Sequence, residues 1–284
     1  MSVDLSERVI VITGAAGGIG SAVVRALLSK GASVVAADVD EAKLSVLVQD
    51  LERDGNGKRL LIVETDVSDS GACAGLVEET IARFDRIDGL INNAALGMGL
   101  VRADHMSNLV GIEELEPHIW DRVVRVNLSG AWYMTRYAIP HMKARGFGRI
   151  INVSTSFFTM LRAGFHPYGP AKAGMEAMAA AHAAEFAGTG ITVNVVVPGG
   201  PTDTPMVPDQ APYKREDLIP PAKMAQPIAW ICGEAGDEIT GQRFVAANWD
   251  ESLPSAEAAL NCGAPAAWPE LANNPVWPGG KPDR

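Results

Sequence analysis

A glycine-rich segment near the start of the chain, TGAAGGIG at 13–20, is the feature that most constrains the fold. It follows a run of apolar, mostly β-branched residues at 8–13 (RVIVIT). In that position Gly14 allows a tight turn, Gly18 lets the backbone approach a pyrophosphate, and Gly20 allows a helix to pack closely on a strand. The first amides of the following helix favour phosphate groups. The segment therefore predicts dinucleotide binding at a strand–turn–helix unit, and the competing interpretation is a turn that binds nothing.

Strand and helix patterns alternate along the chain. Strands are predicted at 8–13, 33–38, 59–64, 88–92, 148–154, 191–197 and 242–246, and helices at 18–30, 41–53, 70–84, 117–143 and 167–187. Strands that are apolar throughout and alternate with helices indicate a parallel sheet covered on both faces. The sequence therefore predicts an α/β fold, a Rossmann-type doubly wound parallel sheet flanked by helices.

The composition changes near Asn248, and residues 250–284 are rich in Pro, Ala and Asn. Trp268 and Trp277 each precede a proline there. Proline-rich tails are often mobile, whereas Trp side chains favour burial against a surface. We therefore expect a single cofactor-binding domain over 1–249 and a C-terminal extension over 250–284 that docks on the domain or on a neighbouring subunit.

Charge and cysteine content exclude several classes of function. The formal net charge is −10 and no run of Lys or Arg stands out, which argues against nucleic acid or an anionic membrane as partner. No apolar stretch is long enough to span a membrane, and we expect no secretory signal. Cys73, Cys232 and Cys262 are far apart and odd in number, which predicts free thiols in a cytoplasmic protein. The histidines lack ligand spacing, so no metal site is expected.

Asp38 closes the second predicted strand. A carboxylate at this place accepts hydrogen bonds from the adenosine ribose diol and repels a 2′-phosphate. Ala15, Ala16 and Val39 supply no base for such a phosphate, so the sequence favours NAD over NADP. Taken alone, Asp38 is equally consistent with a helix cap.

Short polar segments also follow the third and fourth predicted strands, at the sheet edge where ligands bind. Each of them, taken alone, could be turn chemistry. The residues expected to form the cofactor site at this edge are Gly14, Ala16, Gly18, Ile19, Gly20, Asp38, Val39, Asp66, Val67, Asn93, Ala94 and Ala95.

Tyr168 and Lys172, in YGPAK, are spaced i, i+4, so on a helix they lie on one face, one turn apart. A free phenol has a pKa of about 10, and a neighbouring positive charge favours the phenolate. Such a tyrosine can exchange a proton with an alcohol or a carbonyl oxygen near neutral pH. The pair alone occurs often by chance, but its combination with the glycine-rich turn does not.

Together these segments resemble the short-chain dehydrogenase/reductase family over roughly residues 5–245. Five family landmarks occur in order: the glycine-rich turn, Asp66-Val67, an Asn-Asn-Ala-Gly-like segment at 92–95 with alanine in the last place, Asn127 in the long helix, and Tyr168-x-x-x-Lys172.

The resemblance implies a mechanism in which Tyr168 is the general acid/base and a hydride passes between the substrate carbon and nicotinamide. Lys172 would lower the pKa of Tyr168 and hydrogen-bond the nicotinamide ribose. Asn127 would hold a water that links Lys172 to solvent. The alternatives are that Tyr168 is a half-buried aromatic at a helix start, that Lys172 is a solvated lysine, and that Asn127 marks a helix kink or is a polar core residue.

The chain departs from the family pattern in two places. The family's substrate-orienting serine is replaced by Thr155, whose hydroxyl can also donate and accept, with Ser154 and Ser156 as alternates if the loop is shifted. After the sixth predicted strand the segment at 198–206 is one residue longer than the family pattern, and its proline at 201 has no N–H to offer. The nicotinamide contacts that the resemblance implies there are Pro198, Gly199, Pro201 and Thr204.

Three segments are expected to line a substrate cleft: 96–112, 157–167 and 206–218. Phe and Met residues would form apolar walls, and Arg162 would add a polar group. His105 and His166 either touch substrate or are ordinary loop residues.

The leading prediction is an NAD-dependent oxidoreductase that interconverts a secondary alcohol and a ketone. The alternatives are a 3-oxoacyl reductase-type ketoreductase, although the acidic charge discourages an acidic carrier partner, and a noncatalytic dinucleotide-binding protein on the same fold. The resemblance also implies a homodimer or homotetramer that pairs through the helices at 117–143 and 167–187.

Overall fold

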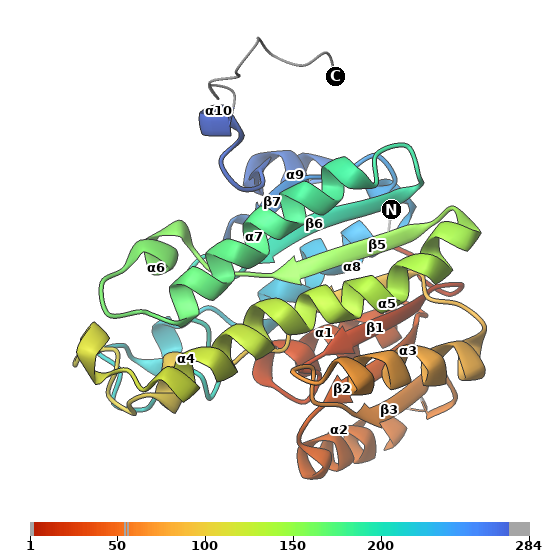
Figure 1. The fold of residues 1–284 in the computed structure, drawn as a ribbon. Coiled ribbons are helices and arrows are strands. Elements are labelled where there is room, and N and C mark those ends of the chain that lie inside the picture. Colours follow the sequence, from red (N-terminus) through yellow and green to blue (C-terminus); the bar gives the residue numbers. More distant parts are fainter. Residues whose placement is uncertain (1–2, 54, 56, 273–284) are drawn as a thin grey trace.

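An eight-stranded sheet forms the centre of the computed structural model, which describes residues 3–272 except 54 and 56 (Figure 1). The strands lie in the order β3-β2-β1-β4-β5-β6-β7-β8, and β1 to β7 run parallel. Their bounds are β1 Val9–Thr13, β2 Ser33–Asp38, β3 Leu60–Glu64, β4 Gly89–Asn92, β5 Gly148–Val153, β6 Ile191–Val197, β7 Gln242–Val245 and β8 Gly263–Pro265. The predicted doubly wound parallel sheet is confirmed.

Helices cover both faces of the sheet (Figure 1). Apolar residues of α1, α2, α8 and α9 form a core on one face, and those of α3, α5 and α7 form a core on the other. β1, β5 and β6 are buried along their whole length between these layers, so their sequences show no alternation of apolar and polar residues. The helix bounds are α1 Gly18–Ser29, α2 Glu41–Arg53, α3 Ser70–Phe84, α4 Pro117–Val124, α5 Gly130–Arg145, α6 Phe157–Leu161, α7 Tyr168–Glu185, α8 Ala225–Cys232, α9 Ser255–Cys262 and α10 Pro269–Ala272.

The prediction of one unbroken helix over 117–143 is wrong. A π-turn at Arg125–Ser129 joins α4 to α5 by admitting one extra residue into the helical ladder. Asn127 lies in this turn and is fully buried. A single extra residue leaves the apolar spacing on either side intact, so the apolar pattern does not reveal the turn; a kink at Asn127 was among the alternatives for that residue.

Residues 246–266, which follow β7, pack on the domain. α9 buries Ala258, Ala259 and Cys262 in the core formed with α1 and α8. β8 pairs antiparallel with β7, so the strand expected at 242–246 is not the last one. The extension therefore adds a helix to the core and a strand to the sheet, while Trp277, expected to dock, lies outside the described residues.

No helix in the described part of the chain is both long enough and apolar enough to cross a membrane.

Candidate active site

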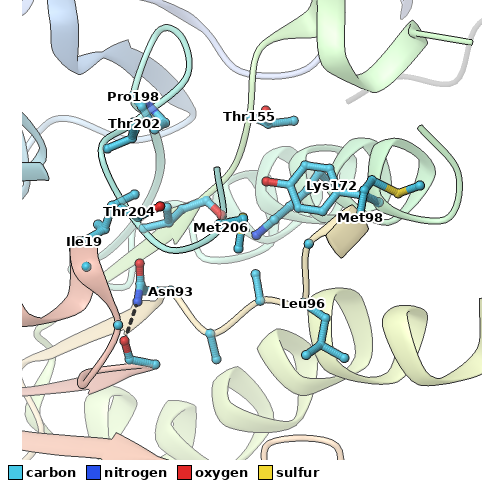
Figure 2. Close-up of a pocket in the computed structure, with 18 of the residues that line it drawn as sticks. Ile19, Asn93, Leu96, Met98, Thr155, Lys172, Pro198, Thr202, Thr204 and Met206 are labelled. Atoms are coloured by element: carbon cyan, nitrogen blue, oxygen red, sulfur yellow. Dashed lines mark hydrogen bonds between the residues drawn. The ribbon is translucent and has the colours of Figure 1, made fainter. Parts of the chain in front are cut away.

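The carboxyl edge of the parallel strands, where ligands of doubly wound sheets bind, opens into a cavity of about 740 Å³. Figure 2 shows Ile19 and Asn93 at one side of it, Thr155 and Lys172 at another, and Thr204 between them. The residues expected to contact cofactor all line this one cavity: Gly14, Ala16, Gly18, Ile19, Gly20, Asp38, Val39, Asp66, Val67, Asn93, Ala94, Ala95, Tyr168, Lys172, Pro198, Gly199, Pro201 and Thr204.

The glycine-rich turn is fixed by its own backbone and by the segment after β4. Gly14 has φ +64°, a conformation that favours glycine. A side-chain carbon on Gly20 would lie 2.1 Å from the Gly14 carbonyl oxygen, so α1 packs against the turn at a distance only glycine permits. The hydroxyl of Thr13 accepts hydrogen bonds from the backbone amides of Asn93 and Ala94. The side-chain amide of Asn93 donates to the Gly14 carbonyl at 2.9 Å (Figure 2).

Asp38 ends β2 beside this turn. Its two carboxylate oxygens accept from the backbone amides of Ala16 at 3.0 Å and Asp40 at 3.1 Å. Lys43, which the sequence did not single out, also lines the cavity, but its ammonium is 2.6 Å from a carboxylate oxygen of Asp40. This end of the cavity thus presents a fixed carboxylate and a lysine that already has a partner.

The three neighbouring hydroxyl residues after β5 make different contacts. The side chain of Thr155 lies in the cavity beside Tyr168 and acts to lower the pKa of its phenol. The hydroxyl of Ser154 is buried and donates to the backbone carbonyl of Lys172 at 3.4 Å. Ser156 caps α6 by accepting from the amide of Thr159 at 3.1 Å. Of the three, Thr155 is the one in contact with Tyr168.

Lys172 is 1 % exposed and its ammonium donates to the carbonyl of Val153 at 2.7 Å. Burial lowers the pKa of Lys172 to about 7, because a charged group loses its hydration. Burial also raises the pKa of Tyr168 to about 12, and Thr155 opposes this only in part. Burial is thus the larger effect on the pKa of Tyr168 in the chain by itself, and the role of Lys172 in lowering that pKa stays a prediction.

Asn127 contacts the loop after β4. Its side-chain oxygen accepts from the backbone amide of Leu96 at 2.8 Å, and its side-chain nitrogen donates to the Leu96 carbonyl at 2.9 Å. Within the described chain Asn127 is not part of the cavity wall, unlike Thr155, Tyr168 and Lys172. Its side chain fixes the start of the 96–112 loop, and its role in holding a water stays a prediction.

The segment after β6 lies over the glycine-rich turn. A side-chain carbon on Gly18 would come within 2.6 Å of the methyl carbon of Thr204. Figure 2 shows Thr202 and Thr204 close to Ile19, with Pro198 above them. The segment 198–204, which the family resemblance assigns to nicotinamide, therefore covers the glycine-rich turn, which it assigns to the pyrophosphate.

The part of the cavity formed by the three predicted substrate segments is mostly apolar. Of the two histidines considered there, His105 lines the cavity and His166 does not. His105 is buried, and burial lowers its pKa, so its ring is neutral near pH 7. The apolar side chains that these segments contribute are Leu96, Met98, Met106, Phe158, Phe165, Met206, Val207 and Tyr213.

A buried ion pair lies behind Thr155. Arg243 of β7 donates to the carboxylate of Glu176 of α7 at 3.0 Å, and both side chains are buried. The same guanidinium donates to the backbone carbonyl of Thr155 at 2.6 Å. The amide of Ala267, beyond β8, donates to the Glu176 carboxylate at 3.3 Å. The sequence analysis missed this connection; its only signal was Glu176, a charged residue in the middle of the alanine-rich helix.

The cavity fits a nicotinamide dinucleotide. The turn at Gly14 has no room for side chains and begins α1, whose first amides can bind a pyrophosphate, and Asp38 can bind a ribose diol. Among the described residues no group of His, Cys, Asp and Glu side chains is arranged to hold a metal ion.

Comparison with known proteins supports this assignment. The model of the family described as short chain dehydrogenase matches residues 8–214. The chain belongs to the short-chain dehydrogenase/reductase family. The resemblance drawn from the motifs is thereby confirmed.

Characterised members of the family include both oxidising and reducing enzymes. The cis-4-hydroxycyclohexanecarboxylate dehydrogenase of Sinomonas cyclohexanicum is 35% identical over 252 residues, which cover 85% of this chain and 95% of that protein. The 3-oxoacyl-[acyl-carrier-protein] reductase FabG of Thermotoga maritima is 32% identical over 247 residues, covering 84% and 95%. A solved metagenomic short-chain oxidoreductase in complex with NADP has a TM-score of 0.70 and 27% identity, covering 85% and 97%.

Proposed function

We propose that this short-chain dehydrogenase/reductase interconverts a secondary alcohol and a ketone with NAD as cofactor and Tyr168 as the general acid/base. The observation that carries the proposal is that Tyr168, Thr155 and Lys172, which lies one turn along α7 from Tyr168, all line the cavity that contains the glycine-rich turn. When bound, the cofactor accepts or supplies the hydride.

Tyr168 moves the proton in this proposal. Its phenol donates to the oxygen of a ketone, or its phenolate accepts the proton of an alcohol, while Thr155 hydrogen-bonds the same oxygen and orients it. With pKa values of about 12 for Tyr168 and about 7 for Lys172, the phenol is the dominant form at neutral pH. Reduction starts from that form, whereas oxidation needs a protonated Lys172 to stabilise the phenolate.

The preference for NAD rests on Asp38. Its carboxylate is held by the amides of Ala16 and Asp40, in reach of the cavity, and would repel a 2′-phosphate. Lys43 is the nearest cation that could offset this repulsion, but it is paired with Asp40. The related metagenomic oxidoreductase was solved in complex with NADP, so the assay compares both cofactors.

Nicotinamide absorbance with NAD⁺ and NADP⁺ against a panel of secondary alcohols tests the proposal, with Tyr168→Phe beside the parent. We expect turnover with NAD⁺ and a loss of at least about a hundredfold in kcat in Tyr168→Phe, which keeps its affinity for NADH. A preference for NADP⁺ would refute the role given to Asp38. NADH binding without turnover of any alcohol or ketone would favour a noncatalytic protein.

A 3-oxoacyl reductase-type activity is the second candidate, and the identity with the Thermotoga maritima reductase favours it. Reduction of acetoacetyl-CoA by NADH or NADPH measures it directly. Efficient turnover of this thioester, together with none of the free alcohols, would replace the first candidate with the second.

We also propose a cytoplasmic homodimer or homotetramer that pairs through α4, α5 and α7. Trp120 on α4 and Trp132 on α5 support this, because they are 39% and 46% exposed in the single chain. Light scattering on the parent and on Trp132→Glu tests it: the parent should be an oligomer, and the variant should dissociate.

A further inference from the structure

The substrate part of the cavity contains a fixed positive charge. Arg162 follows directly on α6 and lines the cavity. Its guanidinium donates to the carbonyl of Met106 at 3.2 Å and lies 4.3 Å from the centroid of the Phe165 ring. Phe165 is buried in a small apolar cluster against which Tyr168 also packs. The guanidinium is thus anchored from two sides, in the same wall as the proposed acid/base.

The charge of Arg162 has no carboxylate partner within the part of the chain that the structure describes. Arg102, on the neighbouring loop, is by contrast paired with Glu114. Burial lowers the pKa of His105, and the positive charge of Arg162 lowers it further, so the two side chains are neighbours. The rings of Phe158 and Phe165 also lie against the guanidinium, and a guanidinium among apolar side chains is stabilised by an anion.

We propose that Arg162 binds a carboxylate of the substrate, so that the enzyme acts on hydroxy acids or oxo acids with an apolar body. The inference rests on the proposed function, because it takes Tyr168 and Thr155 as the place of the reacting oxygen. The parallel N–H groups of a guanidinium match the two oxygens of a carboxylate. An ester or amide of the same shape lacks the charge.

The apolar body of such an acid has a surface to pack against. Ring or chain carbons between the carboxylate and the reacting carbon would lie against the apolar wall, which includes Met98 and Met206.

Binding measured without turnover tests the proposal. Calorimetric titration of the full-length protein, with and without NADH, compares butyrate, benzoate and cyclohexanecarboxylate with the corresponding amides. We expect carboxylates to bind at least about tenfold tighter than their amides, and Arg162→Gln to reduce this ratio to about one. Arg162→Lys should keep part of the preference, because it retains the charge without the planar fork.

Arg102→Gln is the matched control. It removes a guanidinium from the same loop region, but Arg102 is bound to Glu114 and does not line the cavity. This variant should keep the preference for carboxylates. If none of the carboxylates binds better than its amide, or if Arg162→Gln and Arg102→Gln reduce the preference equally, Arg162 is not an anion site.

Turnover distinguishes this inference from the proposed function. For an acid that the parent oxidises, Arg162→Gln should raise KM at least about tenfold with kcat within about threefold, and leave KM for the methyl ester unchanged. Tyr168→Phe should instead remove kcat for the acid and the ester alike. Suppose that Arg162→Gln removes the carboxylate preference but Tyr168→Phe keeps its turnover. This result would support the anion site and refute the role of Tyr168.

Discussion

Lys172 and Tyr168 are buried side chains whose pKa values are shifted in opposite directions. Burial lowers the pKa of Lys172 from 10.5 to about 7 and raises that of Tyr168 from 10.0 to about 12. Between pH 7 and 10 the unfolded chain therefore binds a proton at Lys172 that the folded chain does not. The Lys172 contribution to the free energy of unfolding increases with pH over this range, and that of Tyr168 decreases between pH 10 and 12.

Replacing Lys172 should remove its part of this pH dependence. We expect the parent to gain several kcal/mol of unfolding free energy over Lys172→Met when the pH rises from 7 to 10. The reason is that each unit by which the pKa of Lys172 is lowered corresponds to about 1.4 kcal/mol. Urea unfolding of both proteins at intervals across that range measures the difference. Lys58→Met, at an exposed position, is the control and should give a constant difference. A constant difference for Lys172→Met as well would mean that Lys172 stays charged in the folded protein.

Residues of the site were predictable where a motif fixes them locally. The glycine-rich turn and the Tyr168–Lys172 pair depend on neighbours within one helix or turn, so spacing alone places them. The partner of Asn127 was not predictable, because Leu96 reaches it only through the π-turn and the packing of the loop after β4. The pKa shifts likewise depend on burial, which the motif does not encode.

At the level of elements, the Arg243–Glu176 pair connects β7, α7 and the chain after β8 to Thr155. Arg243 holds the Thr155 carbonyl, and Glu176 is bound both by Arg243 and by the Ala267 amide. The side-chain hydroxyl of Thr155 in turn contacts Tyr168. Arg243 is therefore expected to act as a positioning residue, since it acts through Thr155.

A pair of variants separates stability from positioning here. Arg243→Met alone leaves the Glu176 carboxylate buried without its cation and should cost about 3–5 kcal/mol of unfolding free energy. Glu176→Leu combined with Arg243→Met removes both charges and should recover most of this loss. Because the Thr155 carbonyl still lacks its donor, kcat of the double variant should remain lower by about tenfold while KM changes little. Urea unfolding and steady-state kinetics give both quantities, and full recovery of kcat would show that the pair serves stability alone.

Most elements were predicted with the bounds observed, because strands β1 to β6 and helices α1, α2, α3 and α7 have clear apolar patterns or turn signals. α8 was missed because it is buried on all sides, so its eight residues show no helical period and cannot be distinguished from a strand by pattern. β8 was missed because Gly263–Pro265 has low strand propensity and pairs only as an edge strand, where proline is tolerated.

For the molecule as a whole, the chain after β7 contributes to the core and not only to the surface. A protein that ends at 249 would expose the core positions that α9 covers and lose β8. We expect it to lose on the order of 3 kcal/mol or more of unfolding free energy. A protein that ends at 272 keeps both elements and should melt within a few degrees of the full chain. Thermal melts of the two truncated proteins and the parent test this, and equal melting temperatures for all three would mean that α9 and β8 add no stability.

The connection from Ala267 through Glu176 and Arg243 to Thr155 also affects how the protein is made. A ribosome releases the chain from its N-terminus, so the glycine-rich turn, Asp38 and the strands up to β6 are complete before β7 and β8 have been synthesised. The contacts that hold the Thr155 backbone are therefore completed only when the segment after β8 has been synthesised.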